Sequence, residues 1–138
     1  MPGKYRILVV DDERDIASVI KKGLEAQGFQ VDAFLSPDEA LNHFKAGKYD
    51  LLLLDIRMPT MNGFQLYREL KKIDEKAKIC FITAFEIYYD EFKKMFPKIR
   101  VNCFVRKPVS IEALSRLIRE ELELSEEKDV LKGTAKMS

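Results

Sequence analysis

Five polar side chains that could carry out chemistry follow four separate apolar runs of the sequence. Asp11 and Asp12 come directly after "YRILVV", Asp55 ends "LLLLD", Thr83 ends "KICFIT" and Lys107 follows "CFVR". An ionised side chain at the end of a buried run is costly unless an opposite charge meets it. Their chemistry therefore depends on whether the fold brings the carboxylates and the lysine together.

Brought together, these groups would suit phosphoryl chemistry. Three neighbouring carboxylates raise one another's pKa values unless a cation lies between them. A cluster of oxygen ligands suits a hard divalent ion such as Mg²⁺, or Mn²⁺ in its place. A lysine and a hydroxyl beside that ion can bind the oxygens of a transferred phosphoryl group, and Asp55 is then the natural nucleophile because carboxylates form acyl phosphates.

The apolar runs alternate with helical patterns five times along the chain. The expected strands cover residues 5–10, 29–35, 49–55, 78–83 and 103–108, and helical patterns follow each of them, the last two at 87–96 and 110–124. This alternation predicts an α/β fold with a parallel sheet covered by helices on both faces. In such sheets functional groups gather beyond the carboxyl ends of the strands, so the three carboxylates, the hydroxyl and the ammonium are expected at one edge.

Capping residues predict several helix boundaries. Gly28 is expected to end the first helix, on which Ile16, Val19, Ile20 and Leu24 form one apolar face. Ser36 and Glu39 form a capping box for the second helix and Gly47 is expected to end it. Ser110 is a plausible cap for the last helix.

Length and charge limit the classes of function. The 138 residues suit one compact domain, expected over residues 1–124, with a tail or helix extension at 125–138. The 24 basic and 23 acidic residues leave a formal charge of +1, which favours neither direct nucleic-acid binding nor a membrane surface. With no signal-peptide pattern and no long apolar stretch, a cytoplasmic location is expected.

The two cysteines and the single histidine do not predict a metal site. Cys80 and Cys103 each lie inside a short apolar run, where small buried core residues are more common than a disulfide or a metal ligand. His43 lies in a helical pattern and is expected at the surface.

Four motifs resemble the receiver domain of two-component response regulators, whether chemotaxis-regulator-like or otherwise stand-alone. They are "ILVVDDE", "LLLLDIRMPTMNGF", "FITAF" and "FVRKP", which occur in the family's order over roughly residues 5–122. The resemblance implies a flavodoxin-like, doubly wound sheet of five parallel strands in the order 2-1-3-4-5 with five helices. It also implies signalling by a phospho-accepting domain that is not an enzyme in the usual sense.

The resemblance assigns the phospho-acceptor and the metal ligands. Asp55 would accept a phosphoryl group from a phosphohistidine on a sensor histidine kinase. Asp12, Asp55 and the backbone carbonyl of Arg57 would bind Mg²⁺ directly, and Asp11 would act mainly through water.

The resemblance also assigns the phosphate-binding and switch residues. Lys107 would pair with the phosphate, and the Thr83 hydroxyl and the Ala84 amide would donate hydrogen bonds to it. Phe104 stands at the switch position and would turn inward when Thr83 moves toward the phosphate. Pro108 stands where the family often has a cis-linked proline.

The segments after Asp55 and Thr83 carry further expectations. Pro59 and Gly63 would shape the loop after Asp55, with Met58 packed beneath it. In the family that the motifs resemble, the positions of Arg57 and Phe85 commonly tune the phosphate lifetime. Phe85 is expected to hinder the attacking water, or both are exposed loop residues with little kinetic effect. The connection before the fifth strand is longer than is usual, and its aromatic residues could form a partner surface on the fourth helix, fifth strand and fifth helix, or could be core and ordinary surface residues: Tyr88, Tyr89, Phe92 and Phe96.

Three other functions compare less well with the sequence. A phosphatase of the haloacid-dehalogenase type needs a second aspartate two residues after its nucleophile, where this chain has Arg57 after Asp55 and Glu13 after Asp11. A phosphate-independent binding module would not need all the acceptor, acid, hydroxyl and lysine positions filled. A receiver fragment of a longer DNA-binding regulator remains an alternative.

Overall fold

The apolar runs form the strands of one parallel sheet. The computed structural model describes residues 4–84, 90, 93–94 and 103–123. Its strands are β1 (Arg6–Val10), β2 (Gln30–Phe34), β3 (Leu51–Asp55), β4 (Lys78–Thr83) and β5 (Phe104–Arg106). They pair in the order β2-β1-β3-β4-β5, and every pair is parallel. The predicted fold class and strand order are confirmed.

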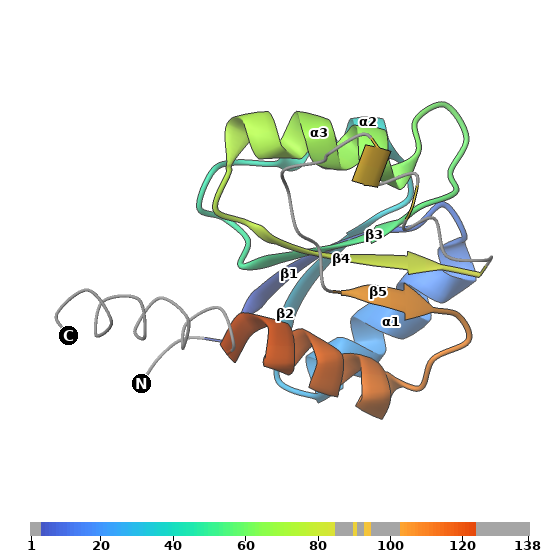
Figure 1. Cartoon of the computed structure of the whole chain (residues 1–138). Coiled ribbons are helices and arrows are strands. Elements are labelled where there is room, and N and C mark those ends of the chain that lie inside the picture. Colours follow the sequence, from blue (N-terminus) through green and yellow to red (C-terminus); the bar gives the residue numbers. More distant parts are fainter. Residues whose placement is uncertain (1–3, 85–89, 91–92, 95–102, 124–138) are drawn as a thin grey trace, which may run out of the picture.

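Helices cover both faces of this sheet, as the alternating pattern predicts. Figure 1 shows α2 (Pro37–His43) and α3 (Gly63–Ile73) on one face, and α1 (Arg14–Ala26) with the helix of residues 111–123 on the other. Besides these four helices, the described residues 90, 93 and 94 are helical. Five helices were expected, and the remaining one, predicted at 87–96, falls almost entirely outside the described residues.

Side-chain caps begin two of the helices where the sequence predicts them. The Glu39 amide donates to Ser36 Oγ at 3.2 Å, and the Ala113 amide donates to Ser110 Oγ at 3.1 Å. Gly28, with φ +99°, follows the end of α1 as expected.

The predicted end of α2 at Gly47 is wrong, because the helix stops at His43. Phe44 leaves the helix with extended backbone angles and turns into the core, where its ring stacks on Tyr49 with centroids 6.0 Å apart. Gly47 lies in the following turn at φ +77°, a conformation that glycine adopts without steric cost. Burial of Phe44 therefore outweighs the local helix signal.

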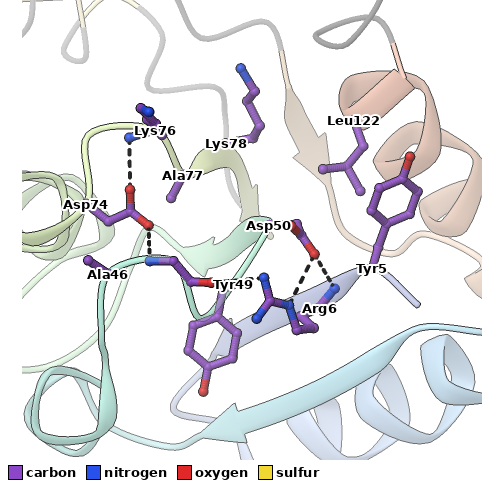
Figure 2. Close-up of a pocket in the computed structure, with 11 residues that line it drawn as sticks. Tyr5, Arg6, Ala46, Tyr49, Asp50, Asp74, Lys76, Ala77, Lys78 and Leu122 are labelled. Atoms are coloured by element: carbon purple, nitrogen blue, oxygen red, sulfur yellow. Dashed lines mark hydrogen bonds and ion pairs between the residues drawn. The ribbon is translucent and has the colours of Figure 1, made fainter. Parts of the chain in front are cut away.

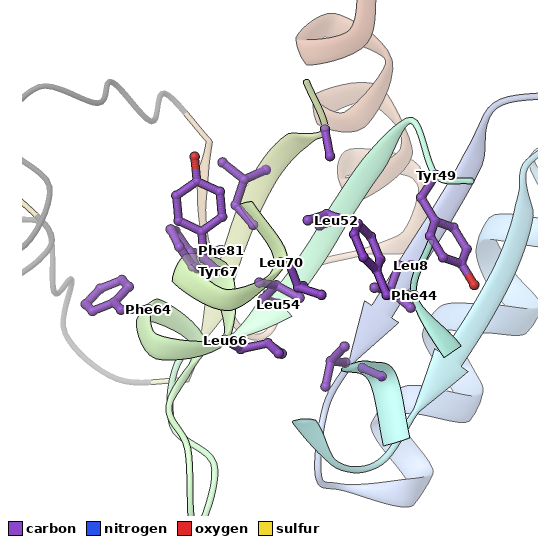
Figure 3. Packing of buried hydrophobic residues seen from close by; sticks show 14 of the residues in the cluster. Leu8, Phe44, Tyr49, Leu52, Leu54, Phe64, Leu66, Tyr67, Leu70 and Phe81 are labelled. Carbon is purple, nitrogen blue, oxygen red and sulfur yellow. The ribbon is translucent and has the colours of Figure 1, made fainter. Parts of the chain in front are cut away.

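The face under α2 and α3 is packed with aromatic and leucine side chains. Phe81 of β4 meets Phe64 and Tyr67 edge-on, with ring centroids 5.0 and 5.8 Å apart. Leu66 and Leu70 of α3 lie beside the strand side chains in Figure 3. Since β3 is buried along its whole length, the carboxylate of its last residue, Asp55, lies at a buried strand end.

The opposite face is packed by α1 and the helix of residues 111–123. Ile20 and Leu24 of α1 join Leu114 and Ile118 in this second layer. Val19, expected on the same helix face, is 60% exposed, so that part of the prediction is wrong. One residue turns a helix by about 100°, so the buried stripe through Ile20 leaves Val19 toward solvent.

The two cysteines form a disulfide, contrary to the prediction of separate core thiols. Cys80 of β4 and Cys103, just before β5, are bonded with their Cα atoms 4.6 Å apart. Both are buried, as predicted. They are bonded because Phe81 pairs with Phe104, which places the preceding residues of both strands opposite each other within disulfide reach.

The remaining expectations of the sequence concern the surface. His43 is exposed on α2, where its Nδ1 lies 2.9 Å from the Glu39 carbonyl oxygen and its ring stacks on Phe34. Within the described ranges no helix is both long enough and apolar enough to cross a membrane.

Candidate functional site

Three aspartates meet at the carboxyl ends of β1 and β3. The pairing of Val10 with Leu54 places Asp11 next to Asp55, and both carboxylates are buried, whereas Asp12 is exposed. One carboxylate oxygen from each of the three lies within 4.8 Å of the others. The parallel register therefore brings together acids that are 44 residues apart in the chain.

Lys107 joins this cluster from the end of β5. Its ammonium donates a hydrogen bond to Asp11 Oδ2 at 2.7 Å and lies 3.7 Å from Asp55 Oδ2 and 4.0 Å from Glu13 Oε1. Its amide donates to the Thr83 carbonyl at 2.7 Å, which fixes the chain beside β4. With its side chain only 10% exposed, Lys107 is the cation that meets the buried acids, and the peptide bond that follows it to Pro108 is cis.

The cluster perturbs the ionisation of Asp55. The pKa of Asp55 is raised from 3.8 to about 7, mainly by burial and next by the negative charge of Asp11. The positive charge of Lys107 acts against this rise, the charge of Asp12 adds to it, and the hydrogen bond from the Arg57 amide to the carboxylate lowers the pKa slightly. Burial alone would lower the pKa of Lys107, but its hydrogen bond to Asp11 and the charges of Asp11, Asp55 and Glu13 raise it instead. Without a further cation, one lysine does not balance the acids.

That imbalance makes the cluster suitable for a divalent cation. Within the described residues, Asp11, Asp12 and Asp55 are the one group of acids, histidines or cysteines that is spaced to hold a metal ion. Carboxylate oxygens are the ligands that Mg²⁺ and Mn²⁺ prefer, and Mg²⁺ commonly keeps several waters at such sites. The exposure of Asp12 leaves room for that water.

Thr83, Ala84 and Phe104 complete the edge. Thr83 is buried at the end of β4, and Ala84 is exposed directly after it. Phe104 is partly buried and packs against Phe81 with ring centroids 5.5 Å apart. The hydroxyl and the aromatic ring therefore lie on the paired strands β4 and β5, next to Lys107.

A tight loop holds the backbone of Asp55. The Gly63 amide donates to the Ile56 carbonyl at 2.8 Å, and a Cβ at position 63 would collide with the backbone carbonyl of Asp55. Asn62 and Gln65 form a reciprocal capping box at the start of α3. The interpretation of the sequence missed this box, although an asparagine three residues before a glutamine is its usual signal.

The rest of the predicted loop has mixed support. Met58 is partly buried and packs against the aromatic core layer, and Pro59 is exposed. The left-handed residue in this loop is Thr60, with φ +64°. The predicted tuning residue Phe85 and the predicted surface residues lie outside the described residues: Tyr88, Tyr89, Phe92 and Phe96.

An apolar groove of about 600 Å³ lies beside the acidic edge. It runs between α1 and the segment that follows β5, and its wall includes Val19, Ile16, Lys107 and Ile111. The exposure of Val19 is therefore explained by its place in the groove wall rather than in the core.

A second hollow of about 540 Å³ opens at the opposite, amino-terminal ends of the strands (Figure 2). Its charged groups bind one another, since Asp50 accepts from the Arg6 amide and pairs with its guanidinium. Asp74 likewise accepts from the amides of Gly47 and Lys76. These internal pairs, and the distance from the strand ends that carry the acids, make this hollow a weaker candidate.

Comparison with known proteins agrees with this geometry. Residues 7–119 match the family described as "Response regulator receiver domain". The chain is 34% identical over 119 residues to the uncharacterized transcriptional regulatory protein YkoG of Bacillus subtilis, covering 86% of this chain and 51% of that protein. It is also 34% identical over 119 residues to the probable transcriptional regulator ycf29 of Porphyra purpurea, covering 83% of this chain and 55% of that protein. The chain thus spans about half the length of the curated relatives it matches.

Solved structures of receiver domains superpose on this chain. A CheY-like receiver domain protein of Methanospirillum hungatei superposes with a TM-score of 0.80 at 27% identity, covering 91% of this chain and 99% of that chain. The response regulator TrrA of Thermotoga maritima, solved in complex with Mg²⁺ and BeF, gives a TM-score of 0.72 at 32% identity, covering 84% and 97%.

Proposed function

Because this chain belongs to the family of response regulator receiver domains, we propose that Asp55 is the residue on which it accepts a phosphoryl group. The supporting observation is the position of Asp55 at a buried strand end, beside two further acids and 3.7 Å from the Lys107 ammonium. A structural aspartate would not need a second and a third carboxylate beside it, because like charges at this distance destabilise one another.

The proposed reaction transfers a phosphoryl group from a phosphohistidine. A carboxylate oxygen of Asp55 attacks the phosphorus, a P–O bond forms, and the P–N bond to the donor imidazole breaks. The imidazole leaves with the bonding electron pair and takes up a proton. Mg²⁺ or Mn²⁺, held directly by Asp12, Asp55 and the Arg57 carbonyl and by Asp11 mainly through water, would supply charge neutralisation for the phosphoryl oxygens.

The neighbouring residues of this chain would hold the product. Lys107 would move its hydrogen bond from Asp11 to a phosphoryl oxygen, and the Thr83 hydroxyl and the Ala84 amide would donate to the others. Phe104 would then turn inward as Thr83 moves toward the phosphate. Phosphorylation shifts an existing equilibrium of this kind because the phosphate binds one of its two states more tightly.

The donor would be a sensor histidine kinase that rests in the groove beside α1. This groove is mostly apolar, ends at Lys107, and exposes Val19 to an incoming helix. Replacing Val19 with aspartate is expected to slow transfer from a phosphorylated kinase histidine domain, and to leave phosphorylation by a small donor unchanged. Equal slowing of both reactions would contradict this docking role.

The output of the domain would be conformational rather than catalytic turnover of a substrate. A downstream protein would read the face formed by the predicted fourth helix, β5 and the helix of residues 111–123, of which the structure describes the last two. Residues 1–124 would form the receiver, 125–138 a tail or helix extension, and the location would be cytoplasmic. Since the matched relatives are transcriptional regulators about twice as long, a DNA-binding output in a longer chain is the second candidate.

The proposal is tested by the intact mass of the protein after incubation with acetyl phosphate and Mg²⁺. Gain of one phosphoryl group is expected, dependent on the metal and absent from Asp55→Asn. Asp15→Asn, which removes an exposed acid of α1 outside the cluster, is the matched control and should gain the group normally. If the unaltered protein gains nothing with donors that modify other receivers, a phosphate-independent binding module is the better description.

A further inference from the structure

The disulfide between Cys80 and Cys103 joins the two strands that carry the phosphate-binding end of the sheet. It lies at the amino end of the β4–β5 pairing, and Thr83 and Lys107 lie at the carboxyl end of the same pairing. Three residue pairs separate the two ends, from Phe81 with Phe104 to Thr83 with Arg106. A change at the cysteines is therefore close enough along paired backbone to affect Lys107.

The strand β5 is the shortest strand of the described sheet. It has three residues and is an edge strand that pairs with β4 alone in the described sheet. Hydrogen bonds from the Phe81 amide to the Cys103 carbonyl, and from the Lys107 amide to the Thr83 carbonyl, lie at the two ends of this short ladder. Short edge strands open at lower free energy than central strands, so a covalent bond at one end has a large share in keeping the ladder closed.

The two cysteine residues differ slightly in exposure. Cys80, between β3 and β5, has no exposed surface, whereas Cys103, on the edge strand, is 6% exposed. Thiol–disulfide exchange requires a thiolate to reach one of the two sulfurs. When β5 opens locally, an external thiol would therefore reach Cys103 first, with Cys80 as the leaving group.

A permanent disulfide would be unusual in the setting proposed for this receiver. Cytosolic thiols are kept reduced, and disulfides in mesophilic cytosolic proteins are mostly transient, catalytic or redox-sensing. The two cysteines are nonetheless placed opposite each other on adjacent strands, within bonding reach, with Leu114 and Ile118 of the last helix in the same packed layer. The disulfide therefore forms within the strand register that the sheet already has.

We propose that Cys80 and Cys103 form a reversible dithiol–disulfide site that reacts with a dithiol reductant. The oxidation state of this site controls how tightly β5 pairs with β4, and therefore how firmly Lys107 is held. In the reduction, one reductant thiolate attacks Cys103 Sγ and the Cys80–Cys103 bond breaks. Cys80 leaves as a thiolate and takes up a proton. The second thiol of the reductant then attacks its own sulfur in the mixed disulfide and releases Cys103, which also takes up a proton. Two electrons pass to the protein, and the reductant becomes a cyclic disulfide.

The first experiment counts thiols in the whole chain without using phosphorylation. The protein is equilibrated in buffers of reduced and oxidised glutathione, quenched with N-ethylmaleimide under denaturing conditions, and weighed intact. Two alkylations are expected at reducing ratios and none at oxidising ratios, with both forms present between them. A pair that stays oxidised, or stays reduced, at every ratio would overturn the proposal.

The second experiment measures the strand itself by hydrogen exchange. The amides of Val105 and Lys107, which the parallel register directs toward β4, are expected to exchange about tenfold faster after reduction with dithiothreitol, while those of the distant β1 strand are unchanged. The control is the double variant Cys80→Ala with Cys103→Ala, which should match the reduced protein in either buffer. If it does not fold, Cys103→Ala alone serves, since Cys80 then has no cysteine to bond. Equal exchange in the oxidised and reduced protein would overturn the coupling to β5.

The third readout rests on the proposed function and is separable from it. Reduction is expected to slow phosphoryl uptake from acetyl phosphate by about threefold, because Lys107 is less firmly held. Uptake at equal rates in both redox states would overturn the link to Lys107. No uptake in either state would instead count against Asp55 as acceptor and leave the thiol and exchange results standing.

Discussion

The Lys107 ammonium donates a 2.7 Å hydrogen bond to Asp11, a residue 96 positions earlier in the chain. The nearer oxygen of Asp55, the proposed acceptor, is 3.7 Å from the same ammonium. In this state the lysine is therefore held by a neighbour of the acceptor. A phosphoryl group on Asp55 would offer it stronger acceptor oxygens, so the exchange of partners by Lys107 would accompany phosphorylation.

Replacing Lys107 with methionine should destabilise the metal-free protein by about 2–4 kcal/mol, because the buried acids then have no cation. The free energy of unfolding is measured by chemical denaturation with a chelator present, and Mg²⁺ should restore part of the loss. The exposed Lys22 of α1, changed to methionine, is the control and should remain within about 0.5 kcal/mol of the parent. Equal losses in the two variants would contradict the role of Lys107.

The stability of the metal-free protein should fall as the pH rises from 5 to 8. The pKa of Asp55 is raised from 3.8 to about 7, so the folded protein binds a proton there that the unfolded chain has already released. This contribution to stability is complete below pH 3.8 and is lost as the pH rises through about 7. The midpoint of thermal unfolding measures it, Asp55→Asn should flatten the fall, and Mg²⁺ should reverse it at pH 8.

Replacing the exposed Asp12 with asparagine should separate metal binding from folding. We expect Mg²⁺ affinity to fall at least about tenfold, as it commonly does even when an outer partner is lost. The metal-free protein should become more heat-stable, because one of the repelling charges is gone. Titration of the unfolding temperature with Mg²⁺ measures both effects. Asp15→Asn should leave the Mg²⁺ affinity unchanged, and a matching loss of affinity in that variant would show that general surface charge is responsible.

Replacing Gly63 with alanine should cost about 3 kcal/mol of stability, because its Cβ would collide with the backbone carbonyl of Asp55. Gly47→Ala is the comparison, since nothing lies within 4 Å of its Cβ position and its left-handed φ of +77° alone should cost about 1 kcal/mol. We expect only the change at position 63 to slow phosphoryl uptake as well. Similar uptake by both variants would show that the acceptor tolerates movement of its backbone.

The sequence predicts the fold and the meeting of the acids because local signals and parallel topology are sufficient for both. The run through Leu54 ends at Asp55, and parallel pairing carries Asp11 to its side. The disulfide was not predictable in this way, because it depends on a register between β4 and β5 that no local pattern specifies. The end of α2 was mispredicted for a related reason, since the tertiary packing of Phe44 outweighs a local signal.

The long separation between Asp11 and Lys107 also has a consequence during synthesis. On the ribosome the three aspartates emerge first. The lysine that compensates their charge, Lys107, is made 96 positions after Asp11. A nascent chain that has exposed only the three aspartates lacks the cation, the β4 hydroxyl and the β5 edge of the finished site. A partly synthesised receiver therefore cannot bind a phosphoryl group in the complete site. The site is complete only when nearly the whole domain has left the exit tunnel.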